Sequence, residues 1–242
     1  MSTRAQSDEE RRKASAVREM FGAIAPRYDL LNHLLSGGTD RRWRRVCADE
    51  VRKRLRPASC RILDLGCGTG DLSMNFAAPA RVTGCDFSWP MLRIGSNKVS
   101  MAGKAGQITF LAADALALPF PDSRFDAVVS AFVLRNLANI DLGLAEMRRV
   151  LHPGGVLGVL DFSMPGVPLL GGIYRFYFNR ILPRVGRLIS GVDGAYRYLP
   201  ESVGSFPGPV ELCARIEGAG FKAAEYRLLT GGIAVLLMGV AK

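Results

Sequence analysis

Short apolar runs alternate with segments of mixed polarity from Arg61 to the end of the chain. The apolar runs are typical of buried strands, and the mixed segments place apolar residues at helical spacing. The pattern predicts strands at Ile62–Leu65, Val82–Asp86, Ile108–Ala112, Phe125–Ala131, Val156–Phe162, Ala224–Leu229 and Ile233–Val240. It predicts helices at Leu72–Ala77, Pro90–Met101, Leu142–Leu151 and Val210–Ala219. This alternation indicates an α/β fold: a mostly parallel, seven-stranded sheet between helices, closed by an antiparallel hairpin at the Thr230-Gly231-Gly232 turn.

One segment, residues 163–198, interrupts the alternation after the strand Val156–Phe162. A long insertion at the carboxyl edge of such a sheet is typical of a lid over a ligand site. Its aromatic residues could form the core of an added helix pair, or they could line an apolar substrate channel with arginines at a membrane surface. They are Tyr174, Phe176, Tyr177, Phe178 and Tyr196, among Arg175, Arg180, Arg184, Arg187 and Arg197.

The chain before Arg61 has a different character. Residues 1–16 are polar and suggest a frayed tail or the start of a helix, and Pro26 should break any helix through 17–32. Residues 41–56 then read as a basic helix, with eight Lys and Arg against two acids, 8 − 2 = +6. This face could simply be solvated, or it could contact a membrane surface or a polyanion.

A glycine-rich turn follows the first predicted strand. Gly66, Gly68 and Gly70 are spaced by single residues, and a helix-compatible segment comes next. Such a turn lets the backbone approach a ligand closely, although Asp71 stands where a dinucleotide fingerprint has its third glycine, which argues against NAD. Asp86 ends the second strand, where a carboxylate can accept both hydroxyls of a ribose. On its own it could equally cap the next helix, but with the turn at this spacing we favour ribose binding.

Composition narrows the class of protein. A chain of 242 residues that is 48% hydrophobic can form one α/β domain with a sizeable core. The N-terminus does not resemble a signal peptide, and the uncharged runs are too short to span a bilayer. Five cysteines without paired or metal-ligand spacing favour a reducing cytoplasm and no metal. The net charge of +10 is compatible with nucleic acid, with an anionic membrane surface, or with no specific partner.

Together, the turn and Asp86 resemble the S-adenosylmethionine pocket of class I methyltransferases, whose first motif, D-x-G-x-G-x-G, is matched by Asp64, Gly66, Gly68 and Gly70. From Met20 to Lys242 the chain resembles one family of that class, the ubiquinone/menaquinone biosynthesis C-methyltransferases (UbiE/MenG). The most specific segments are Phe21 with Ala25-x-x-Tyr28-Asp29-x-x-Asn32, Ser36-x-Gly38-x-x-Arg41-x-Trp43, Leu134-Arg135-Asn136, and Tyr196-x-Tyr198-Leu199-x-Glu201-Ser202, and Leu229–Ala234 also resembles the family. Asp40 and Asp161 depart from the family, which usually has His and Glu there.

The resemblance implies a single methyltransferase domain over residues 1–242. Residues 1–60 would cover the substrate, 61–162 would bind the cofactor, 163–198 would form the lid, and 199–242 would form the last helix and hairpin. It implies S-adenosyl-L-methionine as cofactor, held by Asp64, Gly66, Gly68, Thr69, Gly70, Asp86, Asp114, Ala115 and Ser130. Asp114 would accept the adenine amino group. The implied reaction is methylation of a ring carbon of a demethylmenaquinol or a methoxy-polyprenyl-benzoquinol, without metal.

For the chemical step we expect Arg135 to stabilise the ionised quinol, with Asn136 and Tyr28 orienting the ring. Arg135 could instead be a helix-cap ion pair. His33 is the second candidate for a base, whereas His152, beside a Pro-Gly-Gly turn, reads as structural. Asp29 and Asn32 could shape the pocket mouth.

Other functions fit parts of the same pattern. One is a class I methyltransferase for another prenylated phenol or a sterol, and another is an RNA methyltransferase, which the basic charge suggests. No basic run interleaved with stacking aromatics occurs outside the lid, so we expect no nucleic-acid partner. A non-catalytic cofactor-binding protein fits the intact turn and Asp86 poorly. We expect a cytoplasmic protein with transient contact to an anionic membrane surface, where a prenylated substrate dissolves.

Overall fold

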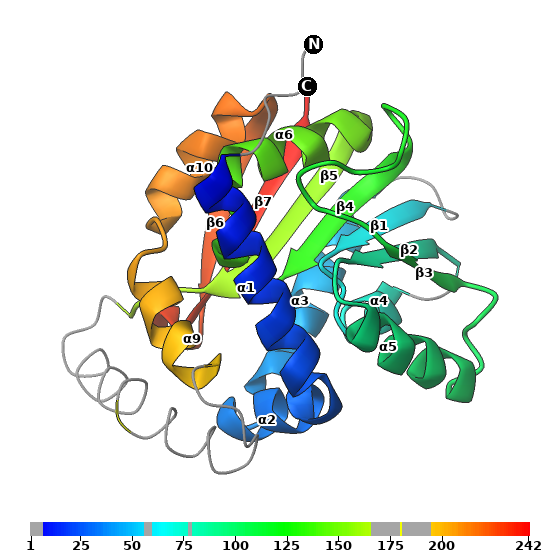
Figure 1. Cartoon of the computed structure of the whole chain (residues 1–242). Coiled ribbons are helices and arrows are strands. Elements are labelled where there is room, and N and C mark those ends of the chain that lie inside the picture. The colour runs from blue at the N-terminus through cyan, green and yellow to red at the C-terminus, as the bar shows by residue number, and fades with distance from the viewer. Residues whose placement is uncertain (1–6, 56–59, 77–78, 166–179, 181–194) are drawn as a thin grey trace.

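The computed structural model describes residues 7–55, 60–76, 79–165, 180 and 195–242. At its centre is a seven-stranded sheet in the order β3-β2-β1-β4-β5-β7-β6 (Figure 1). The strands are β1 (Arg61–Leu65), β2 (Arg81–Asp86), β3 (Ile108–Ala112), β4 (Phe125–Ala131), β5 (Leu151–Phe162), β6 (Phe221–Leu229) and β7 (Ala234–Ala241). Strand β7 runs antiparallel to both of its neighbours, and the pairs among β1 to β5 are parallel. The predicted fold class is therefore confirmed.

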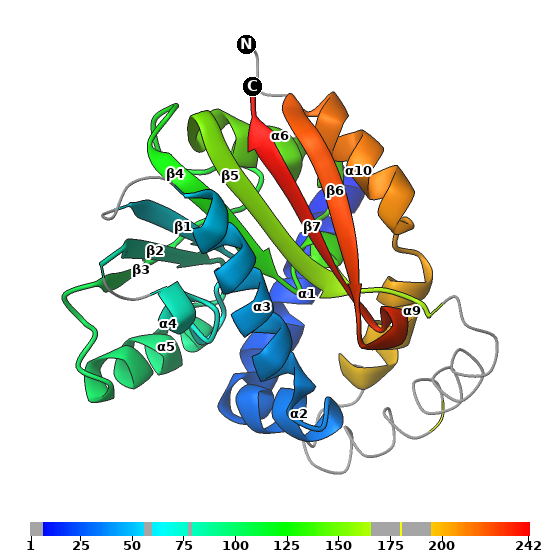
Figure 2. The same cartoon turned by 180° about the vertical axis from the view of Figure 1, so that it is seen from behind.

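Helices cover both faces of this sheet. Their bounds are α1 (Asp8–Ile24), α2 (Tyr28–Leu35), α3 (Thr39–Arg54), α4 (Ser73–Phe76), α5 (Trp89–Met101), α6 (Ile140–Val150), α9 (Ala195–Gly204) and α10 (Pro209–Gly218), with 3-10 turns η1 (Ala25–Arg27), η2 (Leu134–Asn136) and η4 (Thr230–Gly232). One core joins α3, α4 and α5 to the sheet, and a second joins α6 and α10 to its other face, as Figures 1 and 2 show for α10 and α3. Because both faces are covered, β1 and β4 are apolar almost throughout.

All seven predicted strands and all four predicted helices are present, with differences at two strand starts. Strand β5 begins at Leu151, which pairs with Phe125, so the Pro153-Gly154-Gly155 segment, predicted as a turn, lies within the strand instead. Strand β6 begins at Phe221, ahead of an irregularity between Lys222 and Glu225. Both extensions come from pairing with a neighbouring strand, which hydrophobic periodicity does not report.

The N-terminal elements form a cap on the carboxyl edge of the sheet. Helix α1 starts after a capping box, in which Ser7 and Glu10 each bond the other's backbone N–H. The predicted break at Pro26 is confirmed, because η1 separates α1 from α2 there. A third apolar cluster, Ile24, Ala25, Leu31, Met91 and Val203, binds this cap to α5 and α9. Figure 1 shows α1 crossing in front of the sheet toward α2.

The basic helix, α3, exposes fewer free charges than its sequence suggests. Arg44 is buried, forms an ion pair with Asp40, and lies 5.1 Å from the centroid of the Phe132 ring. Three other basic residues pair with acids: Arg52 with Asp49, Lys53 with Glu50, and Arg54 with Glu50 and Glu225. Arg41, Arg42 and Arg45 of this helix are exposed, and none of them forms an ion pair with the described residues.

Most of the predicted lid, 163–198, lies outside the described residues, as do the side chains of Tyr174, Phe176, Tyr177, Phe178 and Tyr196. Among the residues that are described, no helix is both long and apolar enough to cross a membrane.

Candidate functional site

A pocket of about 770 Å³, part of it open to solvent, lies at the carboxyl edge of the sheet. Its walls come from segments far apart in the chain. The glycine turn after β1 and the ends of β2 and β3 form one side, α1 and the start of α2 form another, and the segment from Phe132 to Ala138 forms a third. In an open α/β sheet this edge is where ligands bind.

The glycine turn needs its glycines for two different reasons. Gly66 has φ of +64°, and a Cβ added there would lie 2.4 Å from Cγ2 of Val133, so no side chain fits. Gly68 has φ of +55°, but an added Cβ would meet only the ring of Tyr28, at 3.9 Å. Both residues line the pocket. Bare backbone therefore faces the cavity at Gly68, where a Cβ would occupy space a ligand could use.

Asp86, at the end of β2, lines the pocket and is already hydrogen-bonded. Its carboxylate accepts the N–H of Gly68 at 2.9 Å and the N–H of Ser88 at 2.8 Å. Burial raises the pKa of Asp86, while these backbone hydrogen bonds oppose the rise. An ionised carboxylate has about four acceptor sites, so about two stay available for hydroxyl groups. Ser88, and not Asp86, is the N-cap residue of α5, and Asp86 lines the pocket.

Asp114 and Ala115 follow β3 and line the same pocket, and their contact with an adenine ring stays a prediction. Oδ1 of Asp114 accepts the N–H of Leu116 at 2.9 Å, which fixes the carboxylate at the pocket wall.

Four other residues of the predicted cofactor set do not line the pocket and build its surroundings instead. Asp64 is buried and accepts a hydrogen bond from the hydroxyl of Ser73 at 2.5 Å, and burial raises its pKa to about 7. Ser130 is buried and donates to the carbonyl of Leu65 at 2.9 Å. Thr69 donates to Asp29 at 2.6 Å. An added Cβ on Gly70 would lie 2.8 Å from the ring of Phe110. Direct cofactor contact by these four stays a prediction.

The predicted catalytic pair lies on η2. Arg135 is buried, forms an ion pair with Asp161 at 2.6 Å, and lies 5.1 Å from the centroid of the Phe162 ring. Arg135 therefore does form an ion pair, but its partner, Asp161, lies on β5 and not at a helix end. Asn136 lines the pocket and donates to the carbonyl of Phe132 at 3.0 Å. Nε of Arg135 and Oδ1 of Asn136 are buried and have no hydrogen-bond partner among the described residues.

Two tyrosines approach this pair. Burial raises the pKa of Tyr28, although Arg44, a hydrogen bond with Asn32 and Arg135 lower it, so its phenol stays protonated at neutral pH. Burial also raises the pKa of Tyr198, and its hydroxyl has no partner within the described part of the chain. Sequence reasoning used Tyr198 only as part of a motif. The residues around Tyr198 in the sequence did not by themselves indicate a functional role for it.

Neither histidine lines the pocket. Nδ1 of His33 lies 2.9 Å from Asp40, and its Nε2 lies 3.7 Å from Asp71. His152, at the start of β5, lies 3.0 Å from a guanidinium nitrogen of Arg61, at the opposite end of the sheet. This contact agrees with a structural role for His152.

These residues fit the cofactor that the sequence pattern implies. The bare backbone at Gly68, the spare acceptor sites on Asp86 and the carboxylate of Asp114 all face one cavity, and a single nucleoside could reach all three. Asn136 lines this cavity, whereas Arg135, the preceding residue, is buried behind its wall and does not line it.

In sequence, the chain is similar to known methyltransferases. A profile of the ubiE/COQ5 methyltransferase family matches residues 5–241. The demethylmenaquinone methyltransferase of Thermus thermophilus is 52% identical over 91% of this chain and 99% of its own length. The ubiquinone/menaquinone biosynthesis C-methyltransferase UbiE of Geobacter sulfurreducens is 44% identical over 94% of this chain and 89% of its own length.

Solved structures with the same fold are more distant. The cyclase SpnF has a TM-score of 0.69 at 19% identity, covering 94% of this chain and 96% of its own. A SAM dependent methyltransferase from Aquifex aeolicus has a TM-score of 0.57 at 19% identity, covering 81% and 89%. At such identities the likeness concerns the fold alone, which also serves a cyclase.

Proposed function

The chain belongs to the ubiE/COQ5 methyltransferase family, and from that membership we propose that it methylates a ring carbon of a prenylated quinol. S-adenosyl-L-methionine is the methyl donor, and the product would be a menaquinol or a ubiquinol precursor. The observation that carries this proposal is that one pocket is bordered by both the glycine turn with Asp86 and the residues Tyr28 and Asn136. A donor and an acceptor could therefore lie side by side there.

On the donor side, Gly66 and Gly68 would contact the cofactor through their backbone. Asp86 would accept the ribose hydroxyls, and Asp114 would accept the adenine amino group. When bound, the cofactor supplies an electrophilic methyl group on a sulfonium sulfur. Phe21 and Tyr28 of the cap line the pocket and would exclude water from the bound cofactor.

On the acceptor side, one quinol O–H would lose its proton to solvent, and the chain has to favour this ionised form, whose ring carbon is a far better nucleophile than that of the neutral form. After the methyl group leaves the sulfonium sulfur for that carbon, the C–H proton of the same carbon would be released and an oxygen reprotonated, which restores the aromatic quinol. Arginine stays protonated in proteins, so Arg135 would act as a donor and a fixed positive charge and not as a base. Its Nε–H is the group we assign to the quinol oxygen that becomes negative. Asp161 holds the guanidinium in place, and Tyr28 and Asn136 would orient the ring.

The test is direct methyl transfer. Purified protein is incubated with S-adenosylmethionine and one acceptor: a reduced short-chain demethylmenaquinol, a methoxy-prenyl-benzoquinol, the oxidised quinone of either, or a prenylated phenol that is not a quinol. We expect a product 14 mass units heavier (~CH2) from one or both quinols and none from the oxidised quinones, whose rings are poor nucleophiles. Equal methylation of the plain phenol, or none of the quinols, would contradict the proposal. Quinone profiling of cells without the protein would then identify the natural ring.

We also propose that the protein works at the cytoplasmic face of an anionic membrane, where a prenylated quinol dissolves. Leu30 and Leu34 lie one helical turn apart on α2 and are 60% and 56% exposed. Arg41, Arg42 and Arg45 are the free cations of the described part of α3. A basic residue near such a surface contributes about 1 kcal/mol, screened by salt. Liposome sedimentation should show salt-sensitive binding to anionic vesicles; equal binding to neutral vesicles, or none to either, would refute the proposal.

A further inference from the structure

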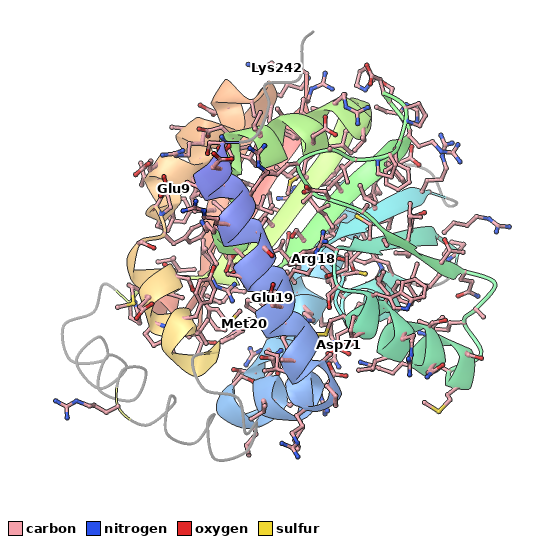
Figure 3. All side chains as sticks on the ribbon, viewed as in Figure 1. Glu9, Arg18, Glu19, Met20, Asp71 and Lys242 are labelled. Carbon is pink, nitrogen blue, oxygen red and sulfur yellow. The ribbon has the colours of Figure 1, made fainter. Side chains whose placement is uncertain are left out.

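A group of charged residues outside the pocket ties the cap to the cofactor-binding core. Lys98, on α5, places its Nζ 2.7 Å from Asp29, 2.5 Å from Asp71 and 3.3 Å from the hydroxyl of Thr69. Thr69 in turn donates to Asp29 at 2.6 Å. The four side chains come from three segments: the start of α2, the glycine turn with the residue after it, and α5. Figure 3 shows Asp71 at the same end of the molecule as Met20, opposite Lys242.

The charges in this group favour a tight contact. The Lys98 side chain is 23% exposed, and those of Asp29 and Asp71 are 27% and 21% exposed. Burial alone would lower the pKa of Lys98, but the carboxylates of Asp71 and Asp29 raise it. The lysine is therefore a cation at neutral pH, and each carboxylate it contacts belongs to a different side of the junction.

Asp29 is the neighbour of Tyr28, and this adjacency connects the group to the reaction. Tyr28 lines the pocket directly over the turn, since its ring is the nearest atom group to a Cβ built on Gly68. The backbone that carries Tyr28 is held on one side by apolar packing of the cap and on the other by Asp29. A small displacement of Asp29 would therefore move the phenol relative to both substrates.

The cofactor-facing part of the turn is fixed without Lys98. The N–H of Cys67 donates to the carbonyl of Cys85 at 3.0 Å, and the N–H of Gly70 donates to the carbonyl of Cys67 at 2.8 Å. Gly68 is held by Asp86. Loss of the lysine would therefore loosen the cap much more than the turn.

We infer that Lys98 is a positioning residue for methyl transfer: it holds Asp29 against the cofactor-binding core and thereby fixes Tyr28 over the donor site. Lys98 does not line the pocket and acts through Asp29. The inference rests on the proposed function for its effect on rate, but the attachment of the cap can be measured without any reaction.

The first experiment compares Lys98→Met with wild type and with Lys104→Met, which removes a lysine whose Nζ bonds the carbonyl of Met74 at 3.1 Å. Hydrogen exchange of the cofactor-free protein should show faster exchange across residues 25–35 in Lys98→Met only, with the strands unchanged. Identical exchange in Lys98→Met and wild type would overturn the inference, whether or not the protein methylates a quinol.

The second experiment measures rate and affinity in parallel. For Lys98→Met we expect turnover of a short-chain demethylmenaquinol to fall about tenfold or more, with S-adenosylhomocysteine affinity changed less than about threefold. A parallel loss of both would assign Lys98 to the cofactor site and overturn the inference. Asp29→Asn should reproduce the rate loss, and the double variant should be no slower than the slower single variant. Additive losses would show that Lys98 does not act through Asp29. If Lys98→Met does not fold, the exchange and rate measurements on Asp29→Asn decide.

Discussion

Removing the carboxylate of Asp86 should abolish the preference for a ribose over a deoxyribose. Asp86 already accepts two backbone N–H groups, from Gly68 and Ser88, so Asp86→Ala breaks the turn as well as any ribose contact. A simple loss of affinity would therefore be ambiguous. Comparing two ligands on two proteins removes this difficulty, because damage to the turn weakens both ligands alike.

The expected magnitude follows from the acceptor sites on Asp86. A hydrogen bond to a charged group contributes about 1.5–3 kcal/mol, and each 1.4 kcal/mol corresponds to about tenfold in affinity. The wild-type protein should then bind S-adenosylhomocysteine about 10- to 150-fold more tightly than its 2′-deoxy analogue. In Asp86→Ala the ratio should fall below about threefold, since a lost hydroxyl no longer removes a hydrogen bond.

Calorimetric titration of both ligands against both proteins gives the ratio directly. Ser205→Ala is the control, because Ser205 bonds the carbonyl of Glu201, does not line the pocket and should leave the ratio unchanged. A folded Asp86→Ala protein that keeps the full wild-type ratio would refute ribose binding by Asp86. It would leave this carboxylate as an organiser of the turn alone.

Other consequences can be measured independently. Arg135→Lys keeps a cation for Asp161 but loses the guanidinium donors, so single-turnover methylation should slow about a hundredfold with cofactor affinity nearly unchanged; a near-native rate would refute the assignment. The pKa of Asp64 is about 7 in the folded protein, against an ordinary value of 3.8. As the pH rises from about 4 to 7, the carboxyl is ionised in the unfolded state while it is still protonated in the folded state, so the free energy of unfolding falls. In denaturant unfolding, the free energy of unfolding of the wild type should fall by at most about 4 kcal/mol relative to that of Asp64→Asn over that pH range. Parallel pH profiles of stability for the two proteins would contradict this. Gly66→Ala should cost about 1–3 kcal/mol in the same assay from its positive φ and the clash with Val133, whereas the open Gly106→Ala should change little; equal effects would be inconsistent with this reasoning.

Much of this architecture follows from the sequence because its signals are local. Strands buried on both faces appear as continuous apolar runs, and the closely spaced glycines after β1 predict the turn there. Asp86 and Asp114 could be predicted to lie close together because strand ends of a parallel sheet share one edge, and both line the pocket at that edge.

What the sequence could not reveal depends on contacts between distant segments. Arg44 looked like one of several surface charges, yet it is buried against Asp40 and Phe132, because helical position alone does not say what packs above it. Lys98 gave no signal, since its partners lie 69 and 27 residues away along the chain. Ser130, at the end of an apolar strand, could equally have faced the ligand or its own sheet.

Two cysteines close to the glycine turn could in principle accept the methyl group in place of the substrate. Cys67 lies within the turn, Cys85 lines the pocket, and both are free thiols. A thiolate next to an activated methyl group would be a competing acceptor, but burial raises the pKa of both cysteines well above the ordinary value and keeps them as unreactive thiols. The protein should therefore resist alkylating itself. Intact-mass spectra after long incubation with S-adenosylmethionine should show no added methyl group while the protein is folded, and a stable adduct on either cysteine would contradict this protection by burial.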